Sequence, residues 1–203
     1  MDVYSDPVGH RTNMMLPNYD AKAIAEALGL VFIQLQRKPK EPAAIADFIV
    51  GGDDRFVIVE QAIGGSGKAG PSQAKSYLAP SVAFLERAVE IGFPRVALRS
   101  LVERLVGDDK SKISGLEWDV VPKTTLERRK NKLSTEESER TERIARLFVH
   151  SRRALGTEAE AREFMITPHP ELDGRSPFDA AKTDLGARRT EGILNALEYG
   201  LAV

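Results

Sequence analysis

The sequence predicts a mainly α-helical protein with an α+β or partly irregular N-terminal extension. From residue 81 onward, apolar residues recur every three or four positions, which is typical of amphipathic helices. The segment from Ser134 to Glu137 resembles a capping box and predicts the start of a long helix that reaches Ala154. The first 80 residues instead contain short runs rich in Val, Ile and Phe, which favour strands.

The composition fits a globular protein and excludes several classes. The 203 residues are 42% hydrophobic and 29% charged, with a net charge of -1 and no cysteine. Gross positive charge therefore cannot drive nucleic-acid binding, and disulfides and cysteine nucleophiles are excluded. The apolar runs are too short to span a bilayer, and the N-terminus lacks the basic and apolar regions of a signal peptide. We expect a cytoplasmic protein with no membrane partner.

The sequence of the N-terminal extension, residues 1–80, predicts one helix and several strands. Residues 20–29 begin with Asp and end with Gly, which are start and stop signals of a short helix. Residues 30–36 and 55–59 are strand-like, and residues 43–50 fit either a helix or a strand.

A glycine-rich stretch at residues 64–72 closes this extension. A phosphate-binding loop needs Gly five positions before Gly-Lys, and Ser or Thr after it. Ala62 stands at the first of these positions and Ala69 follows Lys68, so both requirements fail. We interpret the stretch as a linker.

Residues 94–132 are locally basic. They hold ten cations and six anions, which leaves +4 in a slightly acidic chain. A helix over 95–106, a short helix over 113–120, a turn at Val121-Pro122 and a helix over 123–130 match a helix-turn-helix. The alternative is an ordinary basic helix end, because cations suit a helix C-terminus. We predict DNA contacts at Lys123, Thr124, Thr125, Arg128, Arg129 and Lys130.

Nothing in the sequence indicates an active site, a metal site or a cofactor. The three histidines, His10, His150 and His169, are far apart in the chain, and His169 lies between two prolines in an expected loop. The acidic residues of the long helix alternate with arginines, which predicts a solvated helix face with cross-turn ion pairs. These acidic residues are Glu136, Glu137, Glu139 and Glu142.

Residues 161–200 carry a series of spaced motifs: a bulky pair, a Leu-x-Gly-Arg-x-Pro loop, a Thr-x-x-Gly-Ala segment and a closing Tyr-Gly. They are formed by Phe164, Met165, Leu172, Gly174, Arg175, Pro177, Thr183, Gly186, Ala187, Tyr199 and Gly200. This order closely resembles the toxin-binding domain of the Xre/MbcA/ParS antitoxins, which often have Trp-Leu in place of Phe164-Met165. Segments 125–130 and 133–140 are also typical of that family, so the resemblance covers roughly residues 81–203.

The resemblance implies an interaction protein and not an enzyme. It implies an antitoxin that blocks the NAD-binding active site of a RES-family toxin, which consumes NAD or transfers ADP-ribose, and that represses its own operon. The implied partners are this toxin, operator DNA and a second copy of the chain within a hetero-oligomer. Gly174 and Pro177 are expected to fix a turn. The usual burial preferences make five apolar residues core candidates, namely Leu172, Phe178, Ile193, Leu194 and Leu197. We predict toxin contacts at Arg175, Arg188, Arg189, Tyr199, Gly200, Leu201, Ala202 and Val203.

We therefore expect three parts. Residues 1–80 form the extension, residues 81–150 a helix-turn-helix DNA-binding domain, and residues 151–203 a small helical toxin-binding domain. A chain that is apolar to its last residue suits insertion into a partner's cleft. The alternative function is a free-standing transcriptional regulator whose C-terminal domain only dimerises.

Overall fold

The protein is mainly helical, as the sequence predicts. The computed structural model describes residues 19–35, 48–50, 56–61, 82–129 and 131–200. The N-terminal part contributes the short helix α2 (Ala21–Ala27) and strands β1 (Val31–Leu35), β2 (Phe48–Val50) and β3 (Phe56–Gln61). The predicted linker at 64–72 lies outside the described residues.

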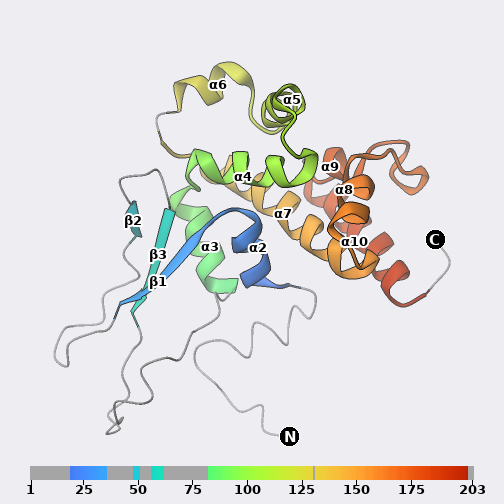
Figure 1. Cartoon of the computed structure of the whole chain (residues 1–203), viewed down its shortest axis with the longest axis horizontal. Coiled ribbons are helices and arrows are strands. Elements are labelled where there is room, and N and C mark those ends of the chain that lie inside the picture. The colour runs from blue at the N-terminus through green and yellow to red at the C-terminus, as the bar shows by residue number, and fades with distance from the viewer. Residues whose placement is uncertain (1–18, 36–47, 51–55, 62–81, 130, 201–203) are drawn as a thin grey trace, which may run out of the picture.

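The strands form a small mixed sheet in the order β1-β3-β2. β1 pairs with β3 in parallel, with Val31 opposite Val57, and β2 pairs with β3 antiparallel, with Phe48 opposite Ile58. The two strand predictions are thereby confirmed, and the ambiguous segment 43–50 has a strand at its end. Helix α3 (Val82–Ile91) follows the sheet in the chain, and Figure 1 draws the sheet on the side of the molecule away from the last helices.

The long helix α7 (Thr135–Leu155) is the centre of the helical body. The predicted capping box is present: the Ser134 hydroxyl accepts from the Glu137 amide, and the Glu137 carboxylate accepts from the Ser134 amide. The helix ends at Gly156, which takes the left-handed conformation at φ 94°. Ile144, Leu147 and Phe148 lie on one face of this helix and are fully buried.

Helix α2 packs against α7 and belongs to the same core. Asp20 caps its N-terminus and Gly29 follows its end at φ 64°, as predicted. Ile24 and Leu28 are fully buried, and one apolar cluster runs from α2 to the last helix of the chain. The expected extension thus supplies part of the core, and the expected boundary between residues 150 and 151 falls inside α7.

Helices α4 (Arg95–Val106), α5 (Lys110–Val120) and α6 (Lys123–Arg128) follow α3. Leu98, Leu101, Val102 and Leu105 of α4 face the core, as their spacing predicts. The group is joined to the start of α7 by a bridge between Pro94 and Lys132 and by the amide of Leu133, which donates to the Phe93 carbonyl at 2.8 Å. These bonds tie the start of α4 to the segment that leads into α7.

The C-terminal part contains α8 (Glu158–Ile166), the 3-10 turn η1 (Pro170–Leu172), α9 (Pro177–Ala180) and α10 (Asp184–Glu198), and α10 packs along α7. Four predicted core residues, Leu172, Phe178, Ile193 and Leu194, are buried. The prediction for Leu197 was wrong, because the last turn of α10 extends beyond the core and leaves this side chain 39% exposed. No helix among the described residues is long and apolar enough to cross a membrane.

Candidate functional site

The predicted DNA-contacting segment consists of two short helices joined by a tight turn. Asp109 caps α5 by accepting from the amides of Ser111 and Lys112. The chain then turns at Val121-Pro122 and enters α6, two residues shorter at its end than predicted. Val121 and Leu126 are buried and anchor the turn and α6 to the core. The opposite side of α6 is therefore presented to solvent.

Three of the predicted DNA-contacting side chains lie on this exposed side. Lys123 and Thr124 are exposed, and the Lys123 ammonium lies 4.8 Å from the centre of the Trp118 ring. Arg128 is also exposed, and its Nε donates to the Thr124 carbonyl at 3.1 Å. Thr125 is half-buried, and Lys130 lies outside the described residues.

Arg129 has a different environment from Arg128. Its Nη2 donates to the Glu137 carboxylate at 3.0 Å, so it links the end of α6 to the capping box of α7. Burial alone would raise the pKa of Glu137, but hydrogen bonds from Ser134 and Arg129 outweigh it, and the pKa lies below its usual value. Arg129 thus meets an ionised partner within its own chain, a pairing that sequence reasoning missed.

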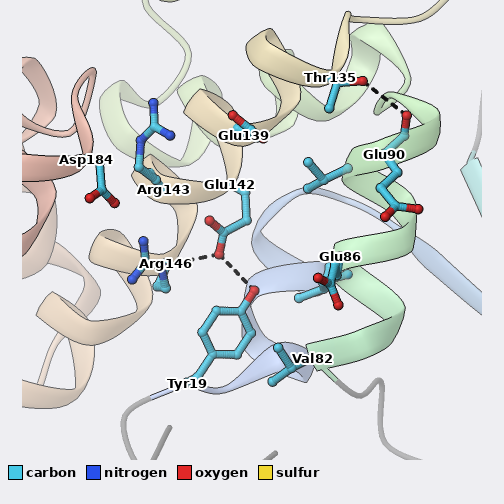
Figure 2. A pocket seen from close by; sticks show the side chains of 12 residues that line it. Tyr19, Val82, Glu86, Glu90, Thr135, Glu139, Glu142, Arg143, Arg146 and Asp184 are labelled. Carbon is cyan, nitrogen blue, oxygen red and sulfur yellow. Dashed lines mark hydrogen bonds and ion pairs between the residues drawn. The ribbon is translucent and has the colours of Figure 1, made fainter.

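The acidic side of α7 is only partly solvated. Glu136 and Glu139 are exposed, as predicted, but the prediction was wrong for Glu137 and Glu142, which other parts of the fold cover. Glu142 accepts a hydrogen bond from the Tyr19 hydroxyl at 2.8 Å (Figure 2). This contact joins residues 123 positions apart, so no local pattern could reveal it.

Glu142 belongs to a polar network that crosses the centre of the molecule. Burial raises the pKa of Glu142, and the nearby Arg146, whose Nε lies 3.3 Å from its carboxylate, offsets part of that effect. Arg146 also pairs with Glu191 of α10. Glu142 and Arg146 border a cavity of about 530 Å³ between Tyr19, α3, α7 and the start of α10 (Figure 2). Among the described residues, no three His, Asp or Glu side chains are placed to hold a metal ion.

Two of the predicted toxin-contacting arginines converge on one loop. Asp173 and Gly174 both take the left-handed conformation, which turns the chain sharply between η1 and α9. The Asp173 carboxylate pairs with Arg189 of α10 at 2.6 Å and lies 3.7 Å from Arg175. The Arg189 guanidinium also donates to the Glu171 carbonyl. Arg189 therefore holds the loop against α10.

The other predicted contacts lie along α10 and beyond its end. Arg188 is exposed and pairs with Asp184 one turn earlier at 2.9 Å. Tyr199 is 71% exposed, and Gly200 takes the left-handed conformation at φ 64°. Leu201, Ala202 and Val203 lie outside the described residues. The structure adds Leu185, which is 76% exposed near the start of the same helix and which the sequence analysis did not single out.

A comparison with protein families gives one match. Residues 150–200 match the family described as the antitoxin Xre/MbcA/ParS C-terminal toxin-binding domain. These residues therefore form a domain similar to the toxin-binding domain of the Xre/MbcA/ParS antitoxins. No curated protein matches the chain. The match covers the end of α7 and all of α8, η1, α9 and α10, so the exposed residues of α10 belong to the toxin-binding domain.

The toxin-binding domain also contains a small apolar groove that the sequence analysis did not predict. It has a volume of about 270 Å³ and lies between the end of α7, helix α8 and the loop that follows. Leu155 and Phe164 line it, and the His169 ring contacts Phe164 edge-on at a centroid distance of 6.0 Å. Side chains from three segments form this groove. The spacing of apolar residues within one helix cannot predict which segments meet, so the sequence pattern did not reveal it.

A buried histidine joins α7 to the last turn of α10 in the same domain. The Nε2 of His150 lies 3.3 Å from the Glu198 carboxylate, which also accepts from Arg153 at 2.8 Å. Burial lowers the pKa of His150, and the hydrogen bond from Arg153 lowers the pKa of Glu198. This cluster fixes the end of α10 and hence the place where the chain leaves the domain at Tyr199.

Proposed function

We propose that the protein is an antitoxin that neutralises a RES-family toxin, an enzyme that degrades NAD or transfers ADP-ribose, by inserting its C-terminal residues into the toxin's active site. The observation that carries the proposal is the toxin-binding domain at residues 150–200, whose last helix ends in an exposed tyrosine followed by an apolar tail. The tail residues Leu201, Ala202 and Val203 enter the cleft, and Tyr199 and Gly200 direct them. The arginines Arg175, Arg188 and Arg189 border the contact.

The second part of the proposal is repression of the antitoxin's own operon by a homodimer that binds operator DNA. Support comes from the exposed side of α6, which carries Lys123, Thr124 and Arg128 beside a tight interhelical turn. Thr125 and Lys130 complete the DNA contact. Arg129 supports the contact by holding α6 against α7 through Glu137.

The proposed division of labour places DNA binding in residues 81–150 and toxin binding in residues 151–203. Residues 1–80 form the extension, of which α2 packs into the shared core. A chain that starts at residue 81 would lose the buried side chains of Ile24 and Leu28. For this reason the full chain is the right material for the experiment.

The role of the tail in toxin binding is tested with a variant that ends at Gly200. Burying Leu201 and Val203 in a partner contributes on the order of 3–5 kcal/mol before ordering costs, which corresponds to a loss of roughly a hundredfold or more in affinity. Calorimetric titration against a catalytically inactive form of the toxin encoded beside this gene measures that loss. The melting temperature of the shortened chain should stay at the full-length value.

Two other results would change the proposal. Full affinity in the shortened chain would remove the tail from the inhibitory contact. A full-length chain that binds its promoter DNA but no neighbouring toxin would favour the free-standing regulator.

A further inference from the structure

Helix α10 contains two glycines with opposite structural roles. Gly186 is required by the fold, because a Cβ at this position would lie 2.1 Å from the Ala180 carbonyl oxygen. Gly192 lies in the middle of the helix and is exposed. Apart from its chain neighbours and the nearby backbone of its own helix, no described atom lies within 4 Å of its ideal Cβ position. Its φ is not positive. Neither packing nor backbone conformation within the described chain therefore explains a glycine here.

A glycine at such a position weakens the helix relative to alanine. One reason for a glycine despite this effect is the close approach of another backbone or a ligand. The glycine alone does not establish a contact, because Gly115 in α5 is also exposed with open space around its Cβ position. The surroundings of Gly192 supply the distinguishing observation.

Gly192 lies midway between the two most exposed large apolar residues of the described chain. Leu185 precedes it by seven residues and Tyr199 follows it by seven, with exposed fractions of 76% and 71%. Residues seven apart share one helix face, so the three form a line along the solvent side of α10. We call this line, together with the half-buried Ala196 one turn after Gly192, the α10 ridge.

The charges beside the α10 ridge are already paired within the chain. Arg188 meets Asp184 at 2.9 Å, and Arg189 meets Asp173 at 2.6 Å. A partner on this face does not need to supply acidic groups. The partner surface that complements the exposed apolar residues of the α10 ridge is therefore an apolar one.

The size of the α10 ridge argues against a second copy as its occupant. Fourteen residues at 1.5 Å each span about 21 Å, and a stripe about 10 Å wide then covers about 200 Å². A stable interface buries about 800 Å² per partner. The ridge is therefore too small to hold a dimer alone, but it can extend a larger interface that already includes this domain. The proposed toxin contact of the domain at residues 150–200 would be such an interface.

We propose that the α10 ridge packs directly against an apolar element of the toxin, with Gly192 as the point of closest approach. This inference rests on the proposed toxin partner and adds a second contact area to the tail. The tail would block the active site, while the α10 ridge would set the distance at which the two proteins dock. Any side chain at residue 192 would hold the surfaces apart.

The test compares Gly192→Ala with the matched control Gly115→Ala. Both substitutions fill open space in a helix interior and should raise the melting temperature of the free antitoxin by about 2–4 °C. Only Gly192→Ala should weaken binding to the catalytically inactive neighbouring toxin, by at least tenfold in Kd, and Gly192→Leu should weaken it further. Calorimetric titration and thermal melting measure both effects on the full chain.

Three outcomes would overturn the inference. Wild-type toxin affinity in Gly192→Ala and Gly192→Leu would show that the surfaces do not approach closely there. A change in the sedimentation mass of the free antitoxin on substitution would make the α10 ridge a contact between copies. If the wild-type chain does not bind the toxin, both the proposed function and this inference are wrong. If truncation of the tail abolishes binding but the Gly192 substitutions do not, only the inference about the α10 ridge is wrong.

Discussion

Arg128 and Arg129 are neighbours in the sequence, but we expect their replacement by alanine to have different effects. Arg128 is exposed on α6, so Arg128→Ala removes one phosphate contact and should lower the slope of log affinity against log salt by about one. Arg129 is bonded to Glu137, and its side chain is 37% exposed. Arg129→Ala should mainly loosen α6 and leave the salt slope close to the wild-type value.

The stability change for Arg129→Ala follows from this pair. A hydrogen bond between charged groups contributes about 1.5–3 kcal/mol when it is buried. The Glu137 side chain is 11% exposed, but the Arg129 guanidinium is more accessible, and solvent screening reduces the figure to about 1 kcal/mol. In a chain of this length, that change lowers the melting temperature by about 2–4 °C. Arg128→Ala should leave the melting temperature unchanged.

The assay combines thermal melting with fluorescence anisotropy on a DNA fragment from upstream of the antitoxin gene, over a series of salt concentrations. The variant that combines Arg128→Ala with Arg129→Ala should lower the slope of log affinity against log salt by about one. If both arginines contacted phosphates, the slope would fall by about two. Arg129→Lys keeps the charge and should recover part of the stability. A reduced slope with an unchanged melting temperature in Arg129→Ala would refute the positioning role.

Three other substitutions test the core, the cap and the central helix. Gly186→Ala places a Cβ 2.1 Å from the Ala180 carbonyl oxygen and should lower the melting temperature by about 2–8 °C; an increase would contradict this packing. Glu137 has a pKa below its usual 4.5 in the fold, so its ionised form stabilises the protein above that pH, and the benefit is lost as pH falls through the lower folded pKa. Glu137→Gln should therefore melt below wild type at neutral pH and converge with it in strong acid, whereas a constant difference would point to packing. Phe148→Ala, in the fully buried centre of α7, should destabilise the chain by about 3–5 kcal/mol in denaturant unfolding; a loss below 1 kcal/mol would contradict its burial.

Signals that act within a few residues could be predicted from the sequence. Asp20 and Gly29 bound α2, Ser134 and Glu137 form the capping box, and Gly200 takes the left-handed conformation. Each depends on a hydrogen bond or a backbone angle that neighbouring residues determine. The helix faces follow in the same way, because apolar spacing selects one side of each helix for burial.

Contacts between distant segments could not be predicted in this way. Glu142 has the same local pattern as Glu139, with arginines around it, yet Tyr19 covers only Glu142. Arg129 resembles Arg128 in every local respect, and the difference arises where α6 meets α7. Its apolar character assigned Leu197 to the core, but it did not reveal that the last turn of α10 extends beyond the core. Sequence pattern predicts which way a side chain points, whereas tertiary packing decides what it meets.

The two proposed surfaces are attached to different parts of α7. The α4–α6 group is tied to the N-terminus of α7 by the Pro94–Lys132 bridge and by Arg129, whereas α10 is tied to its second half through Arg146 and Arg153. The helix has 21 residues, which at 1.5 Å each separates its ends by about 31 Å. Substitutions at exposed residues more than 7–10 Å apart, with no shared partner, act independently. Changes on α6 should therefore affect DNA binding alone and changes on the α10 ridge toxin binding alone, whereas a cavity at Phe148 removes the support that both surfaces share.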